Sequence, residues 1–276
     1  TLDAGANARF NCTGIGLFGC NVRTLSFQMN AADTWGGPPS VNEAIDFLLA
    51  SGAVDAVSGN YIQDTSLMAS YKDHQLSKRG KPERYFLRAT SGTESGNTWE
   101  ILDNVGGYIV LDTTAAHTMG AADTFVIFQS SISKTFTGGI YRFIRISIAA
   151  QQTADNYYEL GSMVAGIATS LTAGWARGYG FDYVYDIDLM DTVSGGTIPI
   201  KGADRKRRFE LEWKANETTR EEVLAIADYM EGKNICLIPD SATLTACYLV
   251  QKDGNVVQNH VSQNKFNFGI RLRENI

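Results

Sequence analysis

The chain is poor in the residue types on which enzymes and metalloproteins depend. It has three histidines and four cysteines among 276 residues, and no Gly-x-Ser-x-Gly, His-Glu-x-x-His or Walker-type run. The cysteines fall in two pairs, Cys12 with Cys20 and Cys236 with Cys247, at spacings that do not match zinc sites. We therefore predict no enzymatic activity, no metal site and no cofactor.

Long apolar runs are also lacking, and proline is scarce. No run approaches the roughly 20 residues of a membrane-spanning helix, so no membrane insertion is expected. No basic segment precedes an apolar core, so no signal peptide is expected in this form. Apolar residues make up 44% of the chain, which is enough for a sizeable core, and glycine is frequent, with 27 residues. This composition favours a β-rich protein with many turns.

The net charge is −6 and the pI is near 5.1, so gripping nucleic acid is not the expected main function. The strongest basic feature is the run Arg205, Lys206, Arg207 and Arg208. These side chains are candidates for phosphate contacts. In an acidic chain, however, we favour pairing with acidic groups of a neighbouring subunit, and we predict a subunit interface at this run.

The N-terminal half shows the pattern of short strands separated by glycine turns. Apolar and polar residues alternate in residues 23–29, and further candidate strands are residues 84–89, 108–111, 124–128, 141–148 and 157–160. In residues 141–148 we expect the Ile144, Ile146 and Ile148 face to be the core side. One helix is predicted near 40–51, because Ser40 and Glu43 form a capping box. Together these features predict a β-sandwich or jelly roll.

The C-terminal part reads as a smaller α+β domain with one main helix. Phe209, Leu211 and Trp213 share one face of a strand, a helix spans 223–230 and Gly232 closes it. Strands follow at 235–238 and 265–274, with a hairpin turn at 252–254. We predict three parts: a sandwich over 1–175, an extended connecting arm over 176–200 and this domain over 201–276. Residues 63–82 are expected to form a long surface loop or a poorly ordered excursion.

Two local features leave alternatives open. The cysteines are either buried free thiols, which the burial preference of cysteine favours, or one or two local disulfides. Asp182, Asp186, Asp188 and Asp191 form an acidic cluster. Its carboxylates either are solvated in a turn, which is the favoured interpretation, or seat calcium through oxygen ligands.

Two resemblances to known families add to this reading. Residues 99–166 resemble discoidin-like (galactose-binding-like) β-sandwiches through Trp99, Leu111-Asp112, a Phe-Val-Ile-Phe strand, a Tyr-Arg-Phe-Ile-Arg-Ile strand and the segment 158–166. Residues 200–276 are similar to C-terminal modules of bacteriophage distal-tail and minor-tail proteins. This second resemblance rests on the Arg-rich start, the Phe-x-Leu-x-Trp strand, Gly232-Lys233, Ile238-Pro239-Asp240 and the final Leu272-Arg273-Glu274.

The resemblances imply a structural protein of a phage virion, in the tail or baseplate. It would assemble in the host cytoplasm into a homo-oligomeric ring, a hexamer or a trimer, and join other tail or baseplate proteins. The alternative is a glycan-binding module that contacts a host surface sugar through aromatic residues near the sandwich loops. Trp99, Tyr157 and Tyr158 are the candidate glycan contacts.

Overall fold

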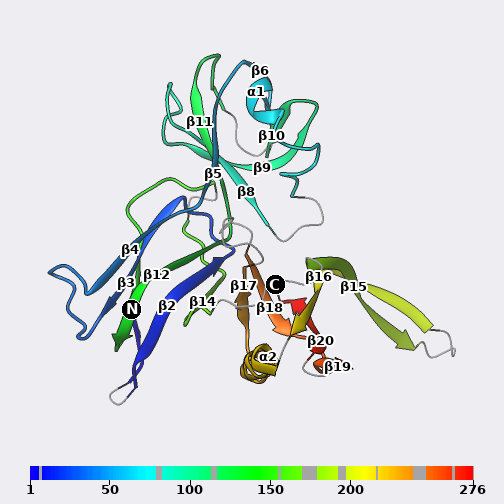
Figure 1. Cartoon of the computed structure of the whole chain (residues 1–276). Helices are drawn as coiled ribbons and strands as arrows, with labels where there is room; N and C mark the ends of the chain where they lie inside the picture. Colours follow the sequence, from blue (N-terminus) through cyan, green and yellow to red (C-terminus); the bar gives the residue numbers. More distant parts are fainter. Residues whose placement is uncertain are drawn as a thin grey trace. The chain divides into compact units, whose positions relative to one another are not determined.

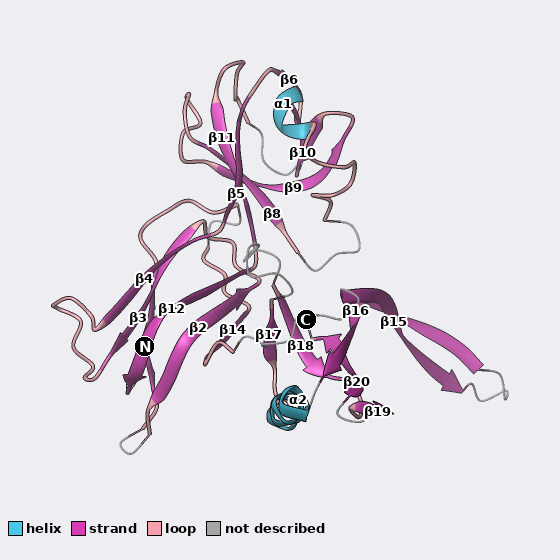
Figure 2. Cartoon of the chain, in the orientation of Figure 1, coloured by secondary structure: helices cyan, strands magenta, loops and turns pink. Residues whose placement is uncertain are grey.

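The computed structural model is mainly β, with several antiparallel sheets and one main helix (Figures 1 and 2). It describes residues 1–5, 8–78, 83–112, 117–154, 157–169, 179–191, 197–215, 217–238, 247–262 and 265–275. Contacts divide the chain into two compact units. Unit 1 is Thr1–Ala168 with Asp240–Cys247, and unit 2 is Thr169–Pro239 with Tyr248–Ile276. Within Asp240–Cys247, the structure describes Cys247 alone.

Unit 1 contains a sandwich-like pair of sheets around one core. One sheet has the order β1-β13-β3-β4 and the other β12-β2-β14. Their bounds are β1 Leu2–Asp3, β2 Phe10–Phe18, β3 Thr24–Asn30, β4 Val41–Asp46, β12 Ile132–Tyr141, β13 Phe143–Ser147 and β14 Ser162–Gly166. Alternation puts Leu25, Phe27 and Met29 of β3 into the core. The predicted Ile144 face of β13 is confirmed as core, because Ile144 is buried and Ile146 packs beside it.

Unit 1 also contains a seven-stranded sheet with a core of its own. Its order is β5-β11-β8-β9-β10-β7-β6. The bounds are β5 Leu48–Ala53, β6 Ala56–Ser58, β7 Tyr61–Gln63, β8 Tyr85–Ala89, β9 Thr98–Val105, β10 Tyr108–Leu111 and β11 Thr124–Gln129, with the short helix α1 at Thr65–Met68. Gly106 and Gly107 both have positive φ and join β9 to β10 in a two-residue turn, as the right-handed twist of paired strands favours.

Two predictions for unit 1 are wrong. Residues 40–51 form strands β4 and β5 instead of a helix. Pairing of β4 with β3 buries Val41 and Ile45 on one face of an extended chain, and β5 pairs with β11. Leu48, placed on the predicted helical face, is 40% exposed. Residues 157–160 form a loop, and the strand β14 begins at Ser162. In the expected long loop 63–82, the described residues form α1 and several turns.

Unit 2 is one antiparallel sheet with a helix packed on it. The sheet order is β15-β16-β20-β18-β17, and β19 also pairs with β20. The bounds are β15 Tyr179–Asp191, β16 Thr197–Ala215, α2 Glu217–Tyr229, β17 Ile235–Leu237, β18 Tyr248–Lys252, β19 Val257–Ser262 and β20 Lys265–Glu274. Phe209, Leu211, Val223, Ala227 and Leu272 are buried in its core.

The strand, helix and closing strand predicted for unit 2 are confirmed, and Gly232 adopts the expected positive φ of 65°. The hairpin predicted at 252–254 is wrong in its pairing. Gly254 has the positive φ of a turn, but β18 and β19 each pair with β20 instead of with each other. The predicted arm 176–200 falls partly outside the described residues. Its described part consists of β15 and the start of β16, and both are strands.

The four cysteines are free thiols. Burial raises the pKa of Cys12, and it raises the pKa of Cys20 to about 12, which makes both unreactive at neutral pH. Among the helices of the described chain, none is long and apolar enough to span a membrane.

Candidate functional site

A loop between β13 and β14 presents two tyrosines to solvent. Tyr157 is 61% exposed and Tyr158 is 47% exposed. With Gln151, Gln152 and Thr153 they line a shallow hollow on the surface of unit 1. We call these five residues the tyrosine platform. The sequence named both tyrosines as candidate glycan contacts, and the structure places them side by side in the chain at one hollow.

Buried Asn21 fixes the tyrosine end of this platform. Its Nδ2 donates to the carbonyl oxygen of Tyr157 at 2.9 Å, and its Oδ1 accepts from the Glu159 amide at 2.8 Å. The Thr153 hydroxyl donates to the same Tyr157 carbonyl at 2.8 Å. Asn21 is 0% exposed. A loop without strand pairing is thus held by a buried side chain that uses its donor and acceptor groups together.

Gln151 fixes the other end of the platform to strand β3 and the residue before it. Its Oε1 accepts from the Arg23 amide at 2.9 Å, and its Nε2 donates to the Thr24 carbonyl at 2.7 Å. The Gln151 amide in turn donates to the Tyr158 hydroxyl at 3.0 Å. The Tyr158 ring is therefore held at its hydroxyl, and the backbone is held at both neighbouring residues, Tyr157 and Glu159.

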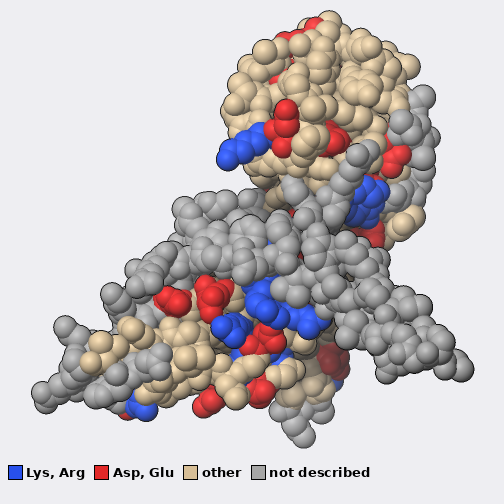
Figure 3. All heavy atoms as spheres, turned by 90° about the vertical axis from the view of Figure 1, so that its right-hand side faces the viewer, with Lys and Arg blue, Asp and Glu red and all other residues tan. Residues whose placement is uncertain are grey.

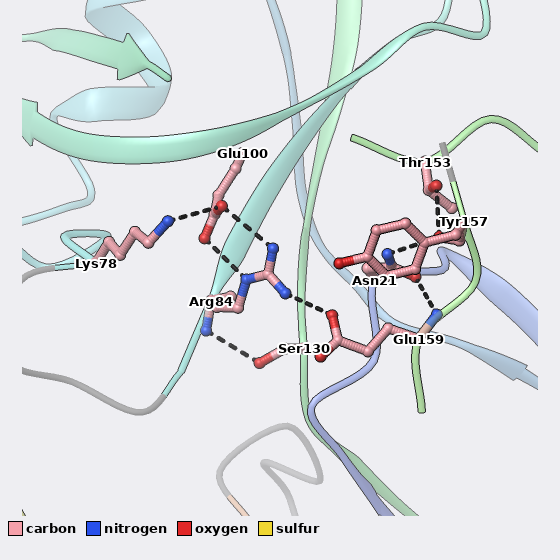
Figure 4. A network of polar contacts seen from close by, with 8 residues as sticks. All are labelled: Asn21, Lys78, Arg84, Glu100, Ser130, Thr153, Tyr157 and Glu159. Carbon is pink, nitrogen blue, oxygen red and sulfur yellow. Dashed lines mark hydrogen bonds and ion pairs between the residues drawn. The ribbon is translucent and has the colours of Figure 1, made fainter. Parts of the chain in front are cut away.

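A charged network continues from the platform to the seven-stranded sheet (Figure 4). Arg84 lies at its centre. Its Nη1 contacts Glu159 Oε2 at 2.7 Å, and its Nε contacts Glu100 Oε1 at 2.9 Å. Lys78 Nζ reaches Glu100 Oε2 at 2.9 Å. The Glu100 side chain is 6% exposed, so this carboxylate is a buried charge matched by two cations. The Arg84 amide donates to Ser130 Oγ at 3.0 Å.

The platform has the chemistry of a site for a neutral, hydroxyl-rich ligand. Its lining consists of two phenol rings, two amides and a hydroxyl, and it includes no charged side chain. Aromatic faces offer apolar contact, and the amide of Gln152 offers a donor and an acceptor. The Gln151 amide and the Thr153 hydroxyl proton are already bonded within the protein and give the platform its shape. In the part of the chain that the structure describes, no three His, Cys, Asp or Glu side chains are grouped to hold a metal ion.

Trp99 does not belong to the platform. It is 4% exposed, lies on β9 in the core of the seven-stranded sheet, and meets the His117 ring edge-on at 5.8 Å. The prediction of a glycan contact at Trp99 is therefore wrong, because its ring is enclosed by the core.

We expect the stability of unit 1 to depend on pH through His117. Burial lowers its pKa, although the Glu94 carboxylate acts in the opposite direction. The unfolded chain therefore takes up a proton near pH 6.5 before the folded chain does, and stability falls as pH drops through that range. We expect a lower thermal midpoint at pH 5.5 than at pH 7.5, and a smaller difference in His117→Gln. An unchanged difference in this variant would assign the effect to other groups.

Two side chains of the basic run are described, those of Arg207 and Arg208, and both pair with acidic residues of unit 2. Arg207 is 6% exposed; its amide donates to Glu274 Oε2 at 3.0 Å, and its guanidinium lies 3.6 Å from Glu274 Oε1. Arg208 pairs with Asp253 at 3.1 Å. Arg207 thus holds the end of β20 and cannot present its charge to a neighbouring subunit, which corrects that part of the prediction. For Arg205 and Lys206 the description covers the backbone in β16.

Described acidic and basic side chains lie beside one another on the face drawn in Figure 3. The four aspartates 182, 186, 188 and 191 lie on strand β15 instead of in a turn.

The sequence also contains a glycine motif that was not used in the predictions. Gly14, Gly16 and Gly19 match the pattern Gly-x-Gly-x-x-Gly. A dinucleotide fingerprint needs this run to open a helix, whereas here it lies in β2 and the turn after it, so it predicts no nucleotide site.

No protein-family model matches the chain, and no curated protein matches it. The fold and the site define a mainly β protein of two units, with a neutral aromatic platform on unit 1 and an extended two-stranded ribbon on unit 2.

Proposed function

We propose that this chain is a structural component of a phage virion, a tail or baseplate protein that assembles into a homo-oligomeric ring and joins other tail proteins. The resemblance of residues 200–276 to tail modules supports this proposal. The observation that carries it is the ribbon of β15 and β16, which extends past the rest of its sheet (Figure 1).

The pairing registers define this ribbon. β20 pairs with β16 from Arg208 to Ala215, whereas β15 pairs with β16 as far as Asp191 opposite Thr197. Residues 183–191 and 197–207 therefore form a two-stranded arm, which no third described strand accompanies. A two-stranded ribbon is at best marginally stable in water by itself. An arm of this length gains its stability where it meets another protein, as the parts of an assembly do.

Removing the arm tests this proposal. Replacing residues 186–204 by Asn-Gly joins the paired residues Tyr185 and Arg205 through a two-residue turn. We expect the variant to keep its circular dichroism spectrum and the thermal unfolding of both units, and to lose the oligomers that the full chain forms. Undiminished oligomers of the folded variant, measured by mass photometry, would refute a role of the arm in assembly.

The tyrosine platform favours a second candidate function, binding of a host surface glycan. We expect Tyr157→Ala with Tyr158→Ala to abolish binding of the intact chain on a glycan array. Tyr158→Phe should weaken it less, because it removes one hydroxyl and keeps the ring. Tyr61→Ala is the matched control, since Tyr61 is 46% exposed and lies on β7, away from the platform residues in sequence and sheet. No binding by the unaltered chain across the array would eliminate this candidate.

A further inference from the structure

The arm has two strand edges, and they differ in how well they are protected from other strands. Among the strands that the structure describes, β15 is the last in its sheet, so no described strand pairs with the outer side of Tyr179–Asp191. On the other side of the arm, no described strand pairs with β16 over residues 197–207, because β20 begins to pair at Arg208. Free edges present unpaired N–H and C=O groups to any extended chain that approaches them.

The β16 edge carries the features by which proteins prevent strand addition. Pro199 lacks a backbone donor, and Lys201 and Lys206 place charge on the strand. The register between β15 and β16 also breaks between Tyr185 and Ile187, where residues 202–204 of β16 face one residue of β15. Such a bulge disrupts the edge further.

The β15 edge has no proline and no positive charge, and the extra residues of the bulge belong to β16. The 13 residues of β15 include no proline, lysine or arginine, and they are rich in tyrosine and β-branched or other apolar residues that favour strands. Its charged residues are four aspartates. The charges of β15 itself are all acidic, whereas the basic run of β16 lies opposite its residues 182–185. Opposite charges across strands stabilise pairing and like charges oppose it, so a basic strand is favoured most along residues 186–191.

We propose that the free edge of β15 is a strand-addition site for a basic extended segment of another protein, with Lys or Arg at alternate positions. This inference rests on the proposed assembly function and names the partner chemistry of the arm. The described basic side chains of the chain's own run do not supply that segment, because Arg207 and Arg208 pair with Glu274 and Asp253 within unit 2. Main-chain hydrogen bonds would give affinity, and the aspartates would select the partner.

The test uses the full chain and a fluorescein-labelled peptide, Thr-Lys-Val-Lys-Val-Lys-Val-Lys-Thr, followed by fluorescence anisotropy. Two control peptides separate the two contributions: one has Pro in place of each Val, which keeps the charge but removes ladder donors, and one has Glu in place of each Lys. We expect the first peptide to bind saturably and both controls to bind at least about tenfold more weakly. Asp182→Asn, Asp186→Asn and Asp188→Asn together should weaken the first peptide about tenfold, as three cross-strand charge pairs imply.

Equal binding of the proline peptide would show charge attraction without strand addition and overturn the inference, as would the absence of binding. Either result leaves the proposed function standing if the intact chain still forms rings. Peptide binding by a chain that never assembles would support the strand-addition site and count against the ring. Binding that persists in the arm-deleted variant would place the peptide elsewhere and also overturn the inference.

Discussion

Replacing Gly138 by alanine is expected to destabilise unit 1 by about 3 kcal/mol or more, or to prevent its folding. A Cβ atom at this position would lie 1.6 Å from the carbonyl oxygen of Cys12 and 3.0 Å from the Cα of Thr13. Both are backbone atoms of the paired strand β2, so no side chain can rotate away. The register between β12 and β2 shifts at this place, between Thr135 and Gly139, and the glycine permits this close approach.

Gly166→Ala is the matched control for Gly138→Ala. Gly166 lies on β14, which pairs with the opposite edge of β2, and a Cβ atom there meets nothing within 4 Å. Both substitutions restrict the unfolded chain equally, so their difference reports the native clash. Urea unfolding followed by far-ultraviolet circular dichroism measures it, and Gly166→Ala should stay within about 1 kcal/mol of the unaltered chain. Equal stability of the two variants would contradict the described register.

Glu100→Gln is expected to cost about 2–3 kcal/mol of stability. The substitution keeps the shape of a side chain that is 6% exposed but leaves Arg84 and Lys78 without its charge. Breaking a buried pair from one side costs about 3–5 kcal/mol. The expected cost of Glu100→Gln is below this general range because Arg84 is 25% and Lys78 44% exposed, and solvent screens exposed charges.

Glu43→Gln offers the comparison for Glu100→Gln. Glu43 pairs with Lys134 at 3.3 Å, and both side chains are partly exposed, at 27% and 35%. Its loss should cost less than about 1 kcal/mol. Thermal unfolding of the two variants at pH 7.5 compares the buried network with the surface pair. Similar midpoints would show that burial of Glu100 does not increase the contribution of its ion pairs to stability. Since the network continues through Arg84 to Glu159, Glu100→Gln is also expected to loosen the tyrosine platform.

A strand is predicted well from the sequence where only one of its two faces packs against the core. In β20 the alternation of Phe266, Phe268, Ile270 and Leu272 is read directly, and the last three are 2% exposed or less. The same reasoning fails for residues 40–51, where apolar residues fit a helical face and a capping box agrees with it. Pairing of β4 with β3, 12 or more residues earlier in the chain, and of β5 with β11 decides the conformation, and local patterns do not contain such partners.

The candidate site shows the same limit. Tyr157 and Tyr158 stand out in the sequence as aromatic residues near a loop, and both are exposed at the platform. The residues that hold them carry no such signal. Asn21 is 138 residues from its partner Glu159, and Glu100 belongs to no motif. A buried asparagine or glutamate becomes recognisable when its hydrogen-bond partners are known, so this shell required the structure.

The two proposals place different demands on the two units. Assembly through the arm concerns β15 and β16 in unit 2, whereas sugar binding concerns the loop between β13 and β14 in unit 1. The arm deletion and the double tyrosine variant therefore alter different units. Each variant serves as a folded control for the other, because loss of assembly should leave glycan binding intact and loss of glycan binding should leave assembly intact.

The most direct test of the assembly proposal is the native mass of the purified full chain, measured over a range of concentrations with electron microscopy of the same samples. We expect closed rings of three or six copies, whose mass is a whole multiple of the 30.1 kDa chain. A chain that remains a monomer at every concentration, with no rings in the images, would contradict assembly into a homo-oligomeric ring.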